Sequence, residues 1–153
     1  MKTKTLSIFA VVIALYACTS KNTSQTSQVL QLNGTWKLIS GTTITKGVST
    51  VTDYTKTQEM IKVINGTHFA FLKHPLHSDT AKVNSFDAGG GRYTLTGNHY
   101  TEHLDYYSDK NWEGKTFEFT VNIKNDTLIQ RGIEKVVNEG IDREIIEKYI
   151  KIK

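Results

Sequence analysis

Apolar and polar residues alternate with a period of two over much of the chain. Between residues 115 and 124, four apolar side chains fall on one face and polar side chains on the other; the apolar set is Phe117, Phe119, Val121 and Ile123. This pattern is typical of a strand with one buried face. Seven further segments alternate similarly and bring the predicted strands to eight; they are residues 34–40, 60–64, 67–73, 92–96, 99–107, 127–133 and 143–152, the last of which also has helical propensity.

The short connections indicate how these strands pair. Asn65-Gly66, Gly97-Asn98 and Asn125-Asp126 each separate two strand-like segments, and such dipeptides tolerate the positive φ of tight hairpins. Strands adjacent in sequence should therefore pair antiparallel. Because closure removes exposed sheet edges, we predict an all-β fold, an antiparallel up-and-down barrel of eight strands with little helix.

Two connections are longer than a tight turn. Residues 41–56 and 74–91 are predicted to form a lid or lip, where binding residues tend to lie. Gly89 to Gly91, inside the second connection, do not precede a helix, so they indicate a flexible turn rather than a phosphate-binding loop.

The start of the chain has the organisation of an export signal. Two lysines precede an apolar run from Leu6 to Ala17, which is shorter than the roughly 20 residues that a membrane span needs. Residues 15–18, LYAC, resemble the lipobox of bacterial lipoproteins. The resemblance implies that residues 1–17 are a cleaved signal peptide and that Cys18 carries diacylglycerol, with fatty acids such as palmitate. An ordinary secretory signal and an uncut signal anchor are the alternatives.

Cys18 is the only cysteine of the chain, so no intrachain disulfide can form and acylation gives this thiol a use. More than one acyl chain is needed for stable membrane anchoring. Residues 19–31 are rich in Ser, Thr, Gln and Asn, which is typical of a solvated tether. We therefore interpret residues 18–32 as the lipidated cysteine with its flexible tether, and residues 33–153 as one domain.

The charge distribution argues against a nucleic-acid partner. The formal net charge of +4 includes the two lysines of the signal, and the other basic residues are scattered among acidic ones, whereas nucleic-acid binding needs a clustered basic face. Thr19 after the cysteine is not the Asp associated with inner-membrane retention in enterobacteria, and no acidic run follows Cys18. By analogy, we expect a monomer in the cell envelope, anchored in the outer membrane and facing the periplasm.

A second resemblance begins at Gly34-Thr35-Trp36, which is similar to the Gly-x-Trp on the first strand of lipocalins. Five downstream segments strengthen it: THF at 67–69, GGGRYTL at 89–95, YTEHL at 100–104, GKTFEF at 114–119 and NDTL at 125–128. Together they resemble small lipocalin-like lipoproteins and secreted proteins of Bacteroidetes-type bacteria. The resemblance implies a barrel with a pocket and assigns no ligand. The usual lipocalin disulfide is impossible here, and Thr52-Asp53-Tyr54 lies too near the first strand to act as the later lipocalin loop.

The aromatic residues of the strands are the main candidate ligand surface. An eight-stranded barrel is just wide enough to hold one small ligand or to be filled by side chains, and the same residues serve both outcomes. The predicted ligand-binding set is Trp36, Phe69, Phe71, Tyr93, Tyr100, Glu102, Tyr106, Phe117 and Phe119.

Glu102 is the informative member of that set. Its strand face also carries Tyr100, Leu104 and Tyr106, so an inward-facing carboxylate there must be hydrogen-bonded. If the barrel contains a cavity, we expect Glu102 to orient the polar head of a ligand. The alternatives are a structural ion pair, for instance with Arg92 or Arg131, and a strand whose opposite face points inward.

The histidines do not predict a metal site or a catalytic site. His74 and His77 have no evident third ligand, although zinc sites need three or four, and four residues of strand hold His99 about 13 Å from His103. His103 and Asp105 share a face without an evident nucleophile and are interpreted as an exposed polar stripe rather than a catalytic dyad. We expect no metal, no cofactor and no enzymatic activity.

These observations favour a lipid-anchored envelope protein whose barrel binds a small hydrophobic or amphipathic molecule. A protein-interaction module with a filled barrel is the alternative. A barrel-type isomerase or hydrolase, with Glu102 or His103 at its centre, is a third class.

Overall fold

The computed structural model describes residues 30–76 and 85–153. This part of the chain forms nine strands and one 3-10 helix, η2 (Val137–Glu139). The strands are β1 (Gly34–Thr45), β2 (Val48–Asp53), β3 (Gln58–Ile64), β4 (His68–Pro75), β5 (Asp87–Thr96), β6 (His99–Tyr107), β7 (Thr116–Lys124), β8 (Thr127–Val136) and β9 (Ile141–Ile152).

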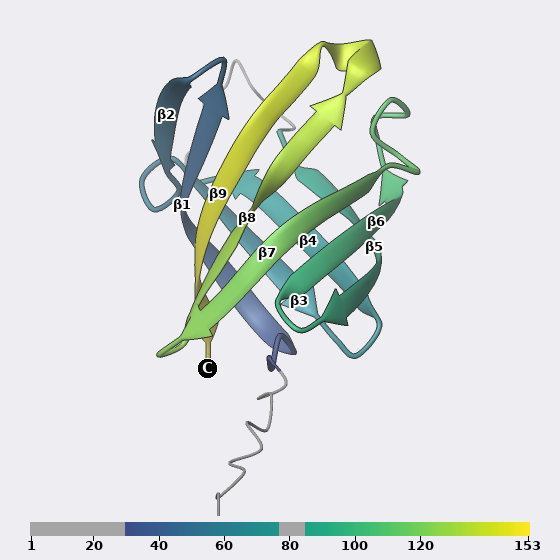
Figure 1. The fold of residues 1–153 in the computed structure, drawn as a ribbon. Helices are drawn as coiled ribbons and strands as arrows, with labels where there is room; N and C mark the ends of the chain where they lie inside the picture. Colours follow the sequence, from purple (N-terminus) through teal and green to yellow (C-terminus); the bar gives the residue numbers. More distant parts are fainter. Residues whose placement is uncertain (1–29, 77–84) are drawn as a thin grey trace, which may run out of the picture.

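Eight of these strands close into an antiparallel barrel (Figure 1). Neighbours from β3 to β9 pair in chain order, β1 pairs with β3, and β9 returns to pair with β1. The predicted all-β, up-and-down barrel with little helix is therefore confirmed. The three predicted hairpins are present, and positive φ at Gly97, Asn125 and Asp126 shows the turn conformation that their dipeptides indicated.

The ninth strand, β2, was not predicted. Residues 41–56 were expected to form a loop, but β1 continues through Thr45 and turns at Lys46 and Gly47, with φ of 50° and 80°, into β2. Every residue of β2 is exposed and it pairs only with β1. Because neither face of β2 is buried, no hydrophobic alternation marked it in the sequence.

The glycines at 89–91 lie inside β5, which corrects their assignment to a flexible turn. A Cβ on Gly91 would lie 1.9 Å from the carbonyl oxygen of His103 and 2.6 Å from the amide nitrogen of Asp105. Glycine is needed there because the backbone of β6 approaches too closely for any side chain. The rest of the predicted loop at 77–84, including His77, lies outside the described residues.

A β-bulge in β6 corrects the orientation predicted for Tyr106. Gly90 pairs with Tyr106, whereas Arg92 pairs with His103, so β6 holds one more residue than β5 between these pairs. The extra residue reverses the in–out alternation beyond Leu104. Tyr106 is consequently 69% exposed on the outside, and Tyr107 faces the interior in its place.

The core fills the end of the barrel at which the described chain begins. Trp36 is fully buried there, and its indole Nε1 donates a hydrogen bond of 2.7 Å to the carbonyl oxygen of Leu32. Leu30 and Leu32, which composition placed in the tether, pack against this core. We call this packed end the base; the buried side chains around it include Leu38, Phe69, Tyr100, Val121, Leu128 and Tyr149.

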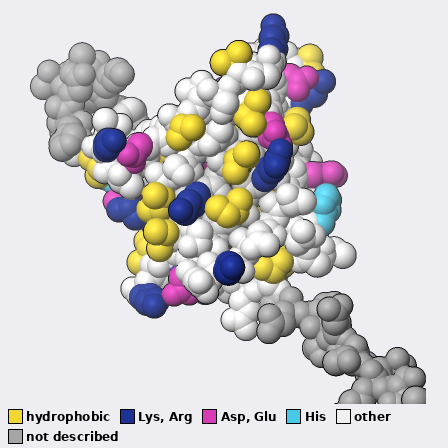
Figure 2. All heavy atoms as spheres, turned by 60° about the vertical axis from the view of Figure 1, so that its left-hand side comes forward, with side chains coloured by type: hydrophobic (Ala, Val, Ile, Leu, Met, Phe, Trp, Pro, Cys, Tyr) yellow, Lys and Arg dark blue, Asp and Glu magenta, His cyan; other side chains and the backbone are white. Residues whose placement is uncertain are grey.

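The outer surface mixes charged and apolar side chains. On the face that includes β1, β2 and β9, hydrophobic groups lie between basic and acidic ones, without a large area of one charge (Figure 2). Val48, Val51, Ile150 and Ile152 are among the exposed apolar residues of these strands. Across residues 30–76 and 85–153, no helix has the length and apolar character to cross a membrane.

Candidate ligand-binding site

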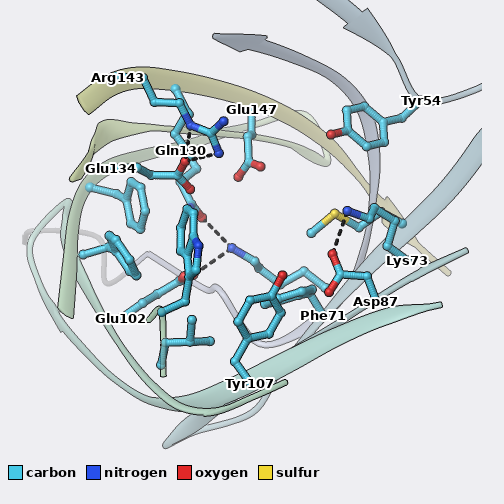
Figure 3. A pocket seen from close by; sticks show the side chains of 17 residues that line it. Tyr54, Phe71, Lys73, Asp87, Glu102, Tyr107, Gln130, Glu134, Arg143 and Glu147 are labelled. Carbon is cyan, nitrogen blue, oxygen red and sulfur yellow. Dashed lines mark hydrogen bonds and ion pairs between the residues drawn. The ribbon is translucent and has the colours of Figure 1, made fainter. Parts of the chain in front are cut away.

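A cavity of about 210 Å³ lies at the end of the barrel opposite the base (Figure 3). We call this end the mouth. Residues from strands β3 to β9 and from the connections after β2 and β6 line the cavity. The barrel interior is therefore packed at the base and hollow at the mouth.

One wall of the cavity is aromatic. The ring centroid of Tyr107 lies 5.9 Å from that of Phe71 and 6.4 Å from that of Trp112, and Trp112 lies 5.7 Å from Phe117. These distances are typical of favourable aromatic pairs. Burial, together with a hydrogen bond to Asp87, raises the pKa of Tyr107 to about 12, so its hydroxyl is neutral. This wall can cover an apolar or aromatic part of a ligand.

The floor of the cavity is a buried ion pair. Lys62 is 3% exposed, and its ammonium donates to the Glu102 carboxylate at 2.7 Å and to the side-chain oxygen of Gln130 at 3.0 Å. The same ammonium lies 5.6 Å and 5.5 Å from the ring centroids of Phe69 and Tyr149, within cation–π range. This network gives both buried charges hydrogen-bonding partners within the protein.

The structure decides between the alternatives for Glu102. Its side chain points inward and forms an ion pair, as one alternative held, but neither suggested arginine is the partner. Arg92 bonds to Asp105 and Arg131 to Glu144, both on the outer face. Tyr100 beneath Glu102 has a buried hydroxyl without a hydrogen-bond partner among the described residues, and burial raises the pKa of Tyr100 well above its ordinary value.

Two further ion pairs stand nearer the opening. The ammonium of Lys73 lies 2.7 Å from the carboxylate of Asp87, and Arg143 lies 2.6 Å from Glu134. The Arg143 guanidinium also stacks 5.9 Å from the ring centroid of Trp112. Each basic group of the cavity is thus already bonded to a carboxylate (Figure 3).

Glu147 differs from the other cavity carboxylates. It has no salt bridge to a basic group in the part of the chain that the structure describes, and it accepts a hydrogen bond of 2.7 Å from the hydroxyl of Tyr149. Its carboxylate points into the cavity (Figure 3). Burial raises the pKa of Glu147, an effect that the nearby charge of Lys62 opposes. This carboxylate is available to a ligand.

The nine predicted ligand-binding residues separate into three groups. Phe71, Glu102, Phe117 and Phe119 line the cavity. The second group, Trp36, Phe69, Tyr93 and Tyr100, belongs to the core or packs against it, outside the cavity lining. Tyr106 alone lies on the outer surface.

Several polar residues of the cavity were missed by the sequence interpretation. Lys62 shares the inward face of β3 with Met60 and Ile64, and Glu147 shares that of β9 with Ile145 and Tyr149. A charged residue at an otherwise apolar, inward position was the signal that could have identified them. Their pairing could not be predicted from the sequence, because partners such as Lys62 and Glu102 are 40 residues apart.

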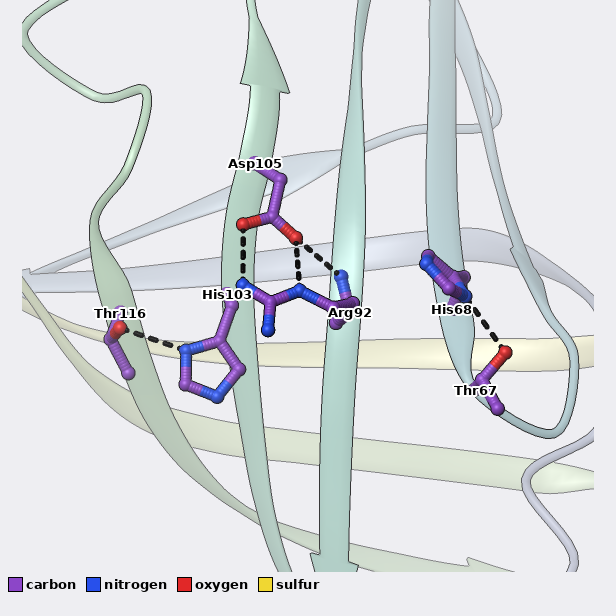
Figure 4. A network of polar contacts seen from close by, with 6 residues as sticks. All are labelled: Thr67, His68, Arg92, His103, Asp105 and Thr116. Atoms are coloured by element: carbon purple, nitrogen blue, oxygen red, sulfur yellow. Dashed lines mark hydrogen bonds and ion pairs between the residues drawn. The ribbon is translucent and has the colours of Figure 1, made fainter.

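His103 and Asp105 of β6 lie outside the cavity, in a polar network on the outer face (Figure 4). Arg92 donates to both carboxylate oxygens of Asp105, at 2.9 and 3.0 Å, and His103 contacts the Thr116 hydroxyl at 3.0 Å. The bond from Arg92 lowers the pKa of Asp105 to about 2. The geometry is that of an exposed polar stripe. Within the described residues, no three His, Cys, Asp or Glu side chains converge as metal ligands.

A closed antiparallel barrel, packed at one end and hollow at the other, defines the lipocalin-like class of folds. A crystal structure of a lipocalin-like protein from Bacteroides uniformis is similar to this chain, with a TM-score of 0.50 and 20% sequence identity. The match covers 79% of this chain and 98% of that protein. No protein-family model matches the sequence. No curated protein matches it either. The likeness therefore establishes a shared fold.

Proposed function

We propose that this protein is a lipid-anchored lipoprotein of the bacterial cell envelope whose barrel binds a small amphipathic molecule. The observation that supports ligand binding is the cavity at the mouth. Its lining joins an aromatic wall, formed by Phe71, Tyr107, Trp112 and Phe117, to a set of fixed charges. Ligand sites typically combine apolar surface with a few placed polar groups in this way.

The size and lining of the cavity narrow the choice of ligand. A volume of about 210 Å³ is below the roughly 300 to 1,000 Å³ of sites for drug-sized ligands, so a small molecule fits, or one part of a larger one. A purely hydrophobic ligand would displace solvent from the polar groups of the lining, Glu147 above all, without offering them a partner, at a cost in free energy. An amphipathic ligand is therefore favoured over a purely hydrophobic one.

The position of the first described residues is compatible with an anchor at Cys18. Leu30 and Leu32 pack at the base, opposite the mouth. A lipid attached upstream would therefore hold the base toward the membrane and turn the mouth toward the surrounding aqueous compartment. We propose that the membrane is the outer membrane and that this compartment is the periplasm.

Binding in the cavity is tested with two neighbouring tyrosines of β6. Tyr107 lines the cavity and Tyr106 is outside, so Tyr107→Ala should weaken binding about tenfold or more, and Tyr106→Ala should not change it. The ligands are octylamine, 1-octanol and octanoate, titrated below micelle formation. Trp112 lines the cavity and reports binding by fluorescence, and Trp36→Phe removes the other tryptophan of the chain.

A saturable Trp112 signal for at least one of the three ligands, lost in Tyr107→Ala alone, supports the cavity as the binding site. Native mass spectrometry of the purified domain gives a second measurement, because a retained molecule would appear as added mass. Binding that depends on Tyr106 would move the site to the outer face. If none of the three ligands binds and no mass is retained, the proposed function is wrong.

The anchor is tested by replacing its only attachment site. Cys18→Ser should move the protein from the membrane fraction to the soluble fraction, because no thiol remains to be acylated. The thermal unfolding of the barrel should be unchanged, since the strands that form it run from Gly34 to Ile152. Retention of the Cys18→Ser variant in washed membranes would contradict lipid anchoring.

A further inference from the structure

The cavity lining contains more acidic than basic side chains. Three basic side chains and four carboxylates line it, and each basic side chain already holds one carboxylate within 2.7 Å. Among the described residues, Glu147 is the cavity carboxylate that is left without such a partner. With these groups ionised, the cavity carries one uncompensated negative charge.

Glu147 has free hydrogen-bonding capacity. A carboxylate offers about four lone-pair sites, and the Tyr149 hydroxyl occupies one of them at 2.7 Å. Burial makes the charged form costly and raises the pKa of Glu147. Lys62, whose charge lowers the pKa of Glu147, is already bonded to Glu102 and Gln130. A cation brought in by a ligand would supply the missing partner.

Aromatic surface lies close to this carboxylate. Tyr54 and Glu147 both line the cavity, and Figure 3 shows the two side chains in the same part of it. The guanidinium of Arg143 already lies over the ring of Trp112, 5.9 Å from the ring centroid. Faces of this kind attract cationic nitrogen.

An anionic ligand would meet the opposite situation. The positive charges of Lys62, Lys73 and Arg143 are each already compensated by a carboxylate. An anionic head group would therefore add a second uncompensated negative charge to the cavity, beside that of Glu147. A cationic head group would instead compensate the charge of Glu147.

We propose that the cavity selects amphipathic amines, whose protonated nitrogen pairs with Glu147 while the apolar part lies against the aromatic wall. This inference rests on the proposed function and adds the chemical class of the ligand. It assigns Glu147 as the residue that determines specificity.

The test compares one alkyl chain carrying three head groups. In the wild-type protein at near-neutral pH, octylamine should bind about tenfold or more tightly than 1-octanol, and octanoate should bind most weakly, because only the amine brings a positive charge to the Glu147 carboxylate. Glu147→Gln should reduce the affinity for octylamine about tenfold and leave that for 1-octanol unchanged. The glutamine keeps the size of the side chain and an oxygen that accepts the Tyr149 hydrogen bond.

Glu144→Gln is the matched control, because Glu144 lies on the same strand and pairs with Arg131 on the outer face. It should leave all three affinities unchanged. If the ligands bind in the cavity with equal affinities, or if octanoate binds best, the amine preference is wrong and the proposed function stands. If none of the three ligands binds, the amine preference is wrong, and the proposed function is wrong as well if native mass spectrometry shows no retained mass. The order of affinities in the wild-type protein tests the inference even if a variant folds poorly.

Discussion

Replacing Lys62 with methionine is expected to reduce the free energy of unfolding by about 3 to 5 kcal/mol. The substitution leaves Glu102 buried, at 7% exposure, without the ammonium that lies 2.7 Å from it. A buried carboxylate that loses its partner keeps the full cost of desolvation. Gln130 also loses the donor to its side-chain oxygen.

Urea unfolding followed by circular dichroism measures this loss. The matched control is Lys37→Met, because Lys37 pairs with Glu59 near the surface, with side chains 38% and 33% exposed; this variant should lose no more than about 1 kcal/mol. Adding Glu102→Leu to Lys62→Met should recover most of the stability, since apolar replacement of both partners is often neutral. A loss below about 1 kcal/mol in the single variant would contradict a buried ion pair at this position.

The second large effect is expected at Gly91. Gly91→Ala should reduce the free energy of unfolding by about 3 kcal/mol, because the new Cβ would lie 1.9 Å from a backbone oxygen of β6. The contacting atoms belong to the backbone and cannot rotate away, so β5 and β6 must separate at the bulge. Thermal or urea unfolding measures the change.

Gly66→Ala provides the comparison, because nothing lies within 4 Å of a Cβ at that turn residue. Its stability should stay within about 1 kcal/mol of the wild type. Equal stabilities for the two alanine variants would show that Gly91 is not needed for the close approach of the strands. Nuclear magnetic resonance of β6 amides would locate the distortion in Gly91→Ala.

Local sequence patterns predicted the strands whose one face is buried. In β7, Phe117, Phe119 and Val121 are buried, and the intervening residues are exposed, so a period of two was sufficient to identify it. β9 was ambiguous by propensity, and pairing on both sides, with β8 and β1, makes it a strand. Pairing with neighbouring strands therefore decided between strand and helix for this segment.

The candidate site could be predicted only in part. Glu102 and Phe117 were identified because a strand pattern turns them inward, and both line the cavity. Tyr106 was assigned to the interior because simple alternation extends to it, and the bulge against Gly90 turns it out. A bulge arises from pairing between two strands, so no single-strand pattern reveals it.

The sequence by itself determined the all-β barrel and its three tight hairpins, because these depend on the side-chain period and on turn chemistry within a few residues. Only the tertiary structure decided that the barrel is packed around Trp36 and hollow at the mouth. It also decided that Glu102 points inward and pairs with Lys62, and that Glu147 has no salt-bridge partner among the described residues. Cavities and ion pairs join residues far apart in the chain, and their geometry follows from closure of the sheet and from its bulges.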